Sequence, residues 1–157
     1  MIRGRRGAVA GIVIAAVLHS GAAAYAGTDG GGATPTGTPV RLYARMTGAA
    51  ERPTPTNSPG VGDAIVYVYP NNVVCTTLRV ARLTTPVVGA HIHVGAATTF
   101  GAVVIPLTPP TNGFSYTCAT VSADLATQLR TNPTNYYANV HTTMFPGGEI
   151  RGQLAAL

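Results

Sequence analysis

The sequence predicts an all-β fold: an antiparallel β-sandwich or barrel of about eight strands, with one short helix at about residues 122–130. Two observations predict it. Short runs rich in Val, Ile, Thr and Tyr recur from residue 40 to residue 154, and Gly, Pro and Asn turn signals separate them. A single segment interrupts this rhythm with helical spacing.

The expected strands follow one another at short intervals. The first covers residues 40–46, and a proline-containing loop at 47–60 follows it. The other expected strands are residues 63–69, 73–83, 87–94, 101–107, 113–121, 136–141 and 149–154. The last two flank the loop at 142–148 and should form a hairpin.

The helix is expected at residues 122–130. Ser122 is a suitable N-cap, Asp124 lies in the first turn, and Arg130 lies at the C-terminal end, where each charge complements the helix dipole. Asn132-Pro133 ends the segment.

The N-terminus has the three-part pattern of a secretory signal peptide. Arginines precede a short apolar run at 7–18, and Ala24-Tyr25-Ala26 offers a cleavage site. An uncleaved anchor is the alternative, although a membrane span needs ~20 apolar residues. We therefore expect a signal peptide at 1–26, a flexible Gly/Thr/Pro leader at 27–39 and a β domain at 40–157. The expected location is secreted, periplasmic or cell-envelope, with no membrane span after cleavage.

The charge of the mature part is small. After residue 26 the chain has seven arginines and five acidic residues, a net charge of +2. Without a basic stripe, nucleic-acid binding is not expected.

The cysteines predict a disulfide. In an exported chain the even pair Cys75 and Cys118 is expected to be oxidised, two buried free thiols being the alternative.

Polar side chains gather on one face of three expected strands, because side chains alternate across a strand and the other face is apolar. These residues are His91 and His93; Tyr137, Asn139 and His141; and Glu149, Arg151 and Gln153.

One interpretation of this set is a metal site. A His-x-His pair projects two imidazoles the same way, about 6–7 Å apart at Cα, which suits copper or zinc. With His91 and His93 as the pair, His141 is the candidate third ligand, and Glu149 is a fourth ligand or an outer-shell acceptor.

The alternative is a structural hydrogen-bond network. Here the imidazoles and Glu149 are satisfied by Arg151, Asn139, Gln153 and nearby backbone groups, which hold the ends of the loop. No catalytic residue is assigned, because the chain has neither a Gly-x-Ser-x-Gly elbow nor a phosphate-binding loop of the Walker type.

Three segments carry a family resemblance: Ala90-His-Ile-His-Val-Gly95, Gly101-Ala-Val-Val-Ile-Pro-Leu107, and Tyr137-Ala-Asn-Val-His-Thr-Thr-Met-Phe-Pro-Gly-Gly-Glu-Ile-Arg-Gly-Gln-Leu154. In this order they resemble the CHRD domain, over roughly residues 40–155, and the cysteine pair resembles bacterial members. Residues 96–100 depart from the family's usual glycine-rich stretch. The resemblance implies a β-rich extracellular domain and no particular reaction.

Three functions remain open. The first is a secreted, non-catalytic structural or binding module with an unknown extracellular or cell-envelope partner. The alternative is a copper- or zinc-binding protein. Its sharper form adds redox chemistry like that of superoxide dismutase, which is also an antiparallel sandwich. The third is a carbohydrate or cell-envelope binder that uses Tyr67, Tyr69, Tyr136 and Tyr137.

Overall fold

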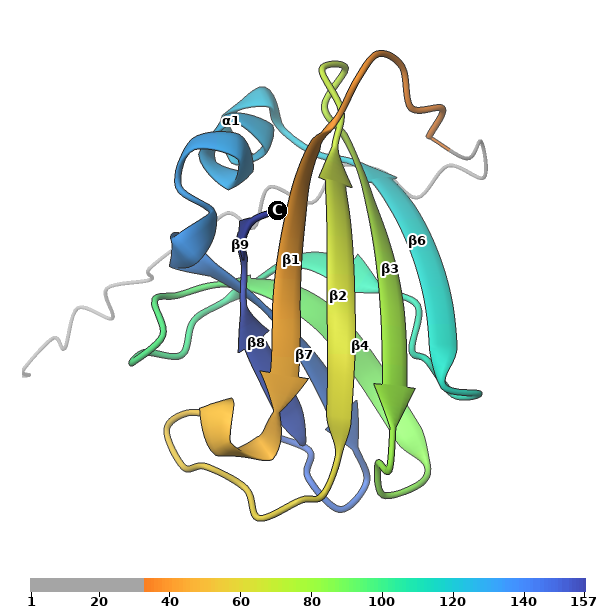
Figure 1. Ribbon diagram of the computed structural model, residues 1–157, viewed down its shortest axis with the longest axis vertical. Coiled ribbons are helices and arrows are strands. Elements are labelled where there is room, and N and C mark those ends of the chain that lie inside the picture. Colours follow the sequence, from red (N-terminus) through yellow and green to blue (C-terminus); the bar gives the residue numbers. More distant parts are fainter. Residues whose placement is uncertain (1–32) are drawn as a thin grey trace, which may run out of the picture.

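The computed structural model describes residues 33–157 (Figure 1). The predicted signal peptide and the first part of the leader lie outside the described residues.

Nine antiparallel strands form one strongly curved sheet, which confirms the predicted fold class. Their order is β5-β4-β7-β8-β1-β2-β3-β6, with β9 paired to β1, and the two end strands β5 and β6 contact each other, so the barrel is nearly closed. In Figure 1, β1, β2, β3 and β6 form the front layer, and the strands that carry the histidines cross behind it. The bounds are β1 Val40–Thr47, β2 Val61–Val68, β3 Val73–Ala81, β4 Val87–Val94, β5 Val103–Leu107, β6 Phe114–Thr120, β7 Tyr136–Thr142, β8 Ile150–Gln153 and β9 Ala155–Ala156.

The helix α1, Ala123–Thr131, lies where it was expected. Ser122 Oγ accepts a hydrogen bond from Leu125 N at 3.2 Å, which caps the first turn. The apolar side of α1 is buried through Ala126 and Leu129, and Arg130 donates to Tyr69 O at 3.1 Å. These contacts hold the helix over one end of the barrel. Two short 3-10 turns, η1 Gly48–Ala50 and η2 Pro133–Asn135, complete the fold.

The core fills the inside of the barrel with alternate residues from each strand. Leu42, Met46 and Val66 come from the front layer, and Ile92 and Ile150 from the rear, all with no exposed surface. Cys75 and Cys118 are directly opposite on β3 and β6 and form the predicted disulfide across the outside of this layer.

The polar outer face of β4, β7 and β8 is covered by two loops. The loop at 95–102 is attached by Arg151, which donates to Ala96 O at 2.8 Å and to Thr99 O at 2.7 Å. The loop at 48–60 is attached by Thr56, whose hydroxyl donates to Glu149 O at 2.9 Å. Asn139 and Arg151 of these strands are therefore as buried as the core.

Candidate functional site

The three predicted histidines meet on the covered outer face. His91 and His93 project from the same side of β4, and the neighbouring strand β7 supplies His141, which pairs with Gly89. One nitrogen from each imidazole lies within 4.8 Å of one nitrogen from each of the other two. Gly89 leaves room for this approach, because a Cβ there would lie 3.3 Å from the His91 ring and 3.6 Å from the His141 ring.

Backbone carbonyls orient two of the rings. His93 Nδ1 lies 2.9 Å from Gly101 O, and His141 Nδ1 lies 3.0 Å from Pro146 O. A carbonyl only accepts, so each Nδ1 carries the proton and each neutral ring keeps its lone pair on Nε2. The two Nε2 atoms are thus left as acceptors.

The free nitrogens differ in how they are satisfied. His141 Nε2 lies 3.0 Å from His91 Nδ1 and can accept its proton. His93 Nε2 is buried and has no hydrogen-bond partner among residues 33–157. A buried acceptor without a partner is uncommon and costs ~1–3 kcal/mol.

All three imidazoles are held neutral at physiological pH. Burial, followed by the charges of His141 and His93, lowers the pKa of His91 to about 4. Burial is also the largest cause of the lowered pKa of His93 and of His141. Protons therefore do not compete for the ring nitrogens near pH 7.

Tyr137 separates the imidazoles from Arg151. Its ring stacks on His93 with centroids 4.8 Å apart, and the Arg151 guanidinium carbon lies 3.5 Å from the tyrosine ring centroid. Since β7 lies between β4 and β8, the three side chains form a layer in the order His93, Tyr137, Arg151. Arg151 also donates to the backbone carbonyls of Ala96 and Thr99, and Gln153 donates to those of Gly95 and Thr134.

Glu149 lies apart from the imidazoles. It is fully buried, and its carboxylate accepts from Ser58 Oγ at 2.6 Å, Thr84 N at 2.9 Å, Thr84 Oγ1 at 2.5 Å and Thr142 Oγ1 at 2.7 Å. Burial raises the pKa of Glu149, but these hydrogen bonds lower it more, to below its ordinary value. Because four donors occupy this carboxylate, it is not available as a metal ligand beside the three histidines.

Glu51 is the carboxylate that sequence reasoning missed. It follows η1, is 3 % exposed, and accepts a hydrogen bond from Asn139 Nδ2 at 2.6 Å. Burial, opposed by the charge of Arg151, raises its pKa to about 7. The available signal was that the chain has only two glutamates, one of them in an otherwise acid-free loop.

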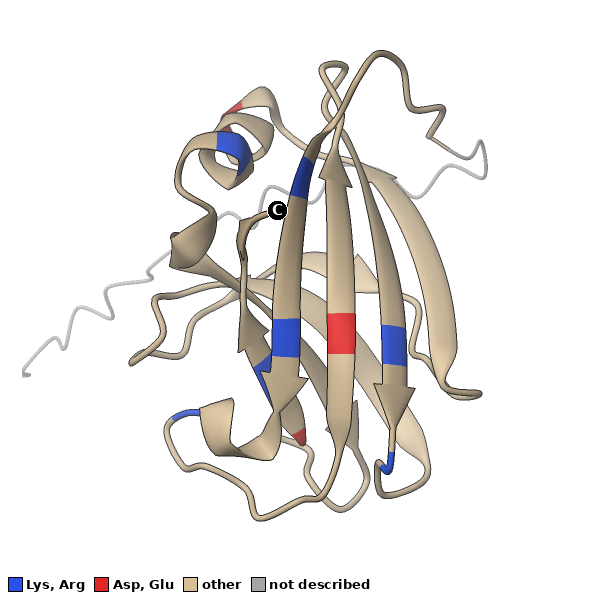
Figure 2. Ribbon diagram, viewed as in Figure 1, with Lys and Arg blue, Asp and Glu red and all other residues tan. Residues whose placement is uncertain are grey.

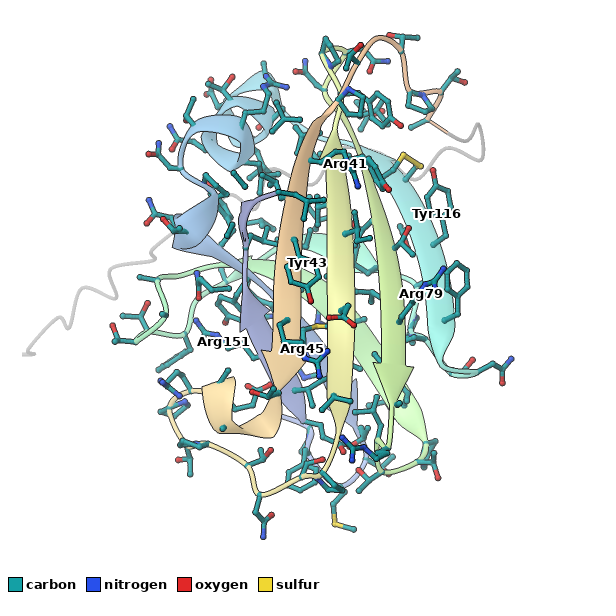
Figure 3. The ribbon with its side chains drawn as sticks, in the orientation of Figure 1. Arg41, Tyr43, Arg45, Arg79, Tyr116 and Arg151 are labelled. Atoms are coloured by element: carbon teal, nitrogen blue, oxygen red, sulfur yellow. A yellow bond between two sulfur atoms is a disulfide. The ribbon has the colours of Figure 1, made fainter. Side chains whose placement is uncertain are left out.

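The front layer carries a different set of side chains. Figure 2 shows arginine bands on β1 and β3 on either side of an acidic band on β2, and the register identifies the row as Arg45, Asp63 and Arg79. Figure 3 shows Tyr43 and Tyr116 on the same layer, away from Arg151. Of the tyrosines proposed for carbohydrate stacking, Tyr136 and Tyr137 are buried.

Comparison with known proteins gives one family. The model of the CHRD domain matches residues 42–154, which is more than half of the chain. Neither the curated proteins nor the solved structures gave a match. Among the described residues, no helix is long and apolar enough to cross a membrane. With the motifs that resembled this family now placed on neighbouring strands, the chain belongs to the CHRD domain family.

Proposed function

We propose that this CHRD domain binds one transition-metal ion, copper or zinc, through His91, His93 and His141. The observation that carries the proposal is the buried His93 Nε2, which has no partner among the described residues and belongs to a cluster of three convergent imidazoles. A structural network alone leaves this nitrogen unsatisfied, whereas a metal ion satisfies it.

The tautomers support a metal. Histidine ligands ordinarily donate their other ring N–H to a carbonyl or carboxylate, which orients the ring. The carbonyls of Gly101 and Pro146 act in this way on His93 and His141. His91 Nδ1 would give up its proton to become the third ligand.

The spacing requires only a small movement. Metal–nitrogen bonds of ~2.0–2.1 Å place two ligand nitrogens about 2.9–3.4 Å apart for angles between 90° and tetrahedral. The separation of 3.0 Å between His91 Nδ1 and His141 Nε2 lies in this range. The other pairs of ligand nitrogens lie up to 4.8 Å apart, so they must approach each other by at most about 1.4 Å. Side-chain rotation provides this movement.

Three neutral imidazoles with an open position are a ligand set for either metal. With copper, an open position would allow the redox chemistry considered above; with zinc, it would hold a water molecule.

The test is metal content of the full chain purified without an affinity tag, then exposed separately to Zn²⁺ and Cu²⁺ and dialysed. We expect one ion per chain in wild type and none in the double variant His91→Ala, His93→Ala. Arg45→Ala, on the opposite layer, is the control and should bind as wild type does. If wild type retains no more metal than the double variant, the proposal fails.

We also infer that the chain acts outside the cytoplasm. The N-terminal pattern and the disulfide support this, because disulfides persist in oxidising compartments. The measured mass of the exported protein should be that of a chain that begins at Gly27 and contains the Cys75–Cys118 disulfide. An unprocessed chain with reduced thiols in the cytoplasm would contradict the inference.

The second candidate function is a non-catalytic binding module for an acidic polysaccharide of the cell envelope. It is favoured by the front layer, where Phe114 and Tyr116 are both 53 % exposed and the cations Arg41 and Arg79 lie over neighbouring aromatic rings. Aromatic rings stack on sugars and arginines pair with their carboxylates or sulfates.

Affinity electrophoresis through gels that contain polygalacturonate tests this candidate. Wild type should be retarded, in a salt-dependent manner, and the variant Arg79→Ala, Tyr116→Ala should not. Equal mobility of the two proteins, or retardation by single-stranded DNA alone, would reject the candidate.

A further inference from the structure

A pocket of about 280 Å³ opens beside the imidazoles, and its chemistry depends on four of its residues: Glu51, His93, Tyr137 and Asn139. Asn139 stands directly opposite His91 in the β4–β7 register and two residues from His141, so it lies among the three rings on the same face. What this pocket can hold is set by the groups that face the imidazoles.

Asn139 supplies a second unsatisfied atom at the cluster. The side chain is 2 % exposed and its Nδ2 donates to Glu51 Oε1, but its Oδ1 has no partner among the described residues. The hydrogen bond to the carboxylate determines the orientation of the amide, because only the NH₂ group can donate. An acceptor therefore remains buried next to the histidines.

The pair of Asn139 and Glu51 is seated against the backbone of the Pro-Gly-Gly turn. At Gly148, with φ of +131°, a Cβ would lie 2.5 Å from Asn139 Nδ2 and 2.7 Å from Glu51 Oε2. Only glycine permits this approach. The turn that is conspicuous in the sequence thus makes room for a buried carboxylate and the amide that holds it.

Arg52 lines the same space, and backbone carbonyls engage one nitrogen of its guanidinium. Its Nη1 donates to the backbone carbonyls of Ala49 at 3.2 Å and of Glu51 at 2.6 Å. Two acceptors beside the imidazoles remain for a ligand, Asn139 Oδ1 and the Glu51 carboxylate.

We propose that Asn139 and Glu51 form the outer wall of a ligand site on the histidine-bound metal, and that this site selects small protic ligands, with water as the resting one. A ligand that binds the metal through an oxygen or nitrogen bearing hydrogen donates to Asn139 Oδ1 and Glu51. A small anion without hydrogen is repelled by the same two groups. The inference rests on the proposed metal site.

The experiment uses the full chain loaded with Co²⁺, which takes the ligands of Zn²⁺ and absorbs visible light. Hydroxylamine, whose metal-bound nitrogen carries hydrogen, and azide, which carries none, are titrated at pH 8.5. The pKa of Glu51 is raised to about 7, so its carboxylate is ionised at pH 8.5. The positive charge of the bound Co²⁺ favours the ionised form further.

Glu51→Gln replaces one acceptor oxygen with an N–H donor and keeps the side-chain shape. We expect azide to bind about tenfold more tightly in this variant and hydroxylamine about tenfold more weakly, the effect of one charge-assisted hydrogen bond. Asp63→Asn removes the same charge from β2 on the opposite layer, and it should change neither affinity.

The outcomes separate the two proposals. If Glu51→Gln binds Co²⁺ normally but has wild-type affinities for both probes, the ligand site is refuted and the metal site stands. Wild type that binds no metal refutes both. If Glu51→Gln does not fold, the wild-type protein alone decides. Its ratio of hydroxylamine affinity to azide affinity is compared with the same ratio for a cobalt tris-imidazole complex. Equal ratios overturn the inference.

Discussion

Glu149→Ala tests whether the conspicuous glutamate of the C-terminal hairpin is structural. Its carboxylate accepts four hydrogen bonds, one from a backbone N–H and three from hydroxyls, and it has no exposed surface. Each buried donor left without its acceptor costs ~1–3 kcal/mol, so losing this carboxylate should cost ~3–5 kcal/mol in all. We expect a loss of that size, a large part of the ~5–15 kcal/mol that stabilises a typical domain.

Glu149→Gln should be milder for a reason visible in the geometry. Oε1 accepts from Ser58 Oγ and from Thr84 N, whereas Oε2 accepts only from the hydroxyls of Thr84 and Thr142. Hydroxyls can turn and accept, so an amide NH₂ fits at the Oε2 position while its oxygen keeps the backbone N–H. We expect a loss of ~1–2 kcal/mol.

The assay is urea unfolding at pH 7, with Asp124→Asn on the exposed side of α1 as a charge-matched control that should cost ~1 kcal/mol or less. Because the folded pKa of Glu149 is lowered, its contribution is present above pH ~4.5 and is lost as the pH falls further. Glu149→Gln removes this acid sensitivity. Glu149→Ala within 1 kcal/mol of wild type, or a folded Glu149→Ala protein that has lost metal binding, would refute the structural role.

Three further predictions concern the rest of the domain. Arg151→Lys cannot reach both carbonyls of the loop at 95–102 and stack on the tyrosine ring, so amides of that loop should exchange hydrogen at least about tenfold faster; unchanged exchange would contradict the anchoring role. Reduction of Cys75–Cys118, which are 43 residues apart, should cost about 4 kcal/mol in urea unfolding, and a Cys75→Ala, Cys118→Ala variant should show no response to reductant. His91 has a folded pKa of about 4 against 6.5 unfolded, so metal-free stability should fall by on the order of 2–3 kcal/mol as pH drops from 6.5 to 4; His91→Asn should flatten this slope.

The fold was predictable because its signals are local. Alternation along each strand and the turn residues between strands follow from the chain itself. A strand boundary differs from the prediction where the backbone conformation interrupts the strand. The third strand ends at Ala81 rather than at residue 83, because Arg82 adopts a left-handed φ of 58°. The same alternation correctly placed His91 and His93 on one face.

Glu149 illustrates the limit of alternation. The expected strand 149–154 put this residue on the face of Arg151, whereas β8 begins at Ile150. Gly148, at positive φ, redirects the chain immediately before it, so the period of two does not extend to Glu149. The carboxylate consequently turns toward Thr84 and Thr142 instead of the histidines.

Glu51 illustrates a second limit. It lies in a loop without periodicity, and its partner Asn139 is 88 residues away along the chain. No local pattern predicts such a contact. It depends on the loop at 48–60 folding over the outer face of the rear strands, which was expected to face away from the core.

The burial of that outer face is the strongest argument for a site there. Only four buried side-chain atoms of residues 33–157 have no hydrogen-bond partner, and two of them, His93 Nε2 and Asn139 Oδ1, lie at the imidazole cluster. The other two are the hydroxyls of Thr76 and Ser115, with no cluster of ligating groups around them. A purely structural network would be expected to satisfy its own members, since each unsatisfied group costs ~1–3 kcal/mol. An unpaired nitrogen and an unpaired oxygen beside three neutral imidazoles and a buried carboxylate are explained together by a metal ion and the ligand it carries.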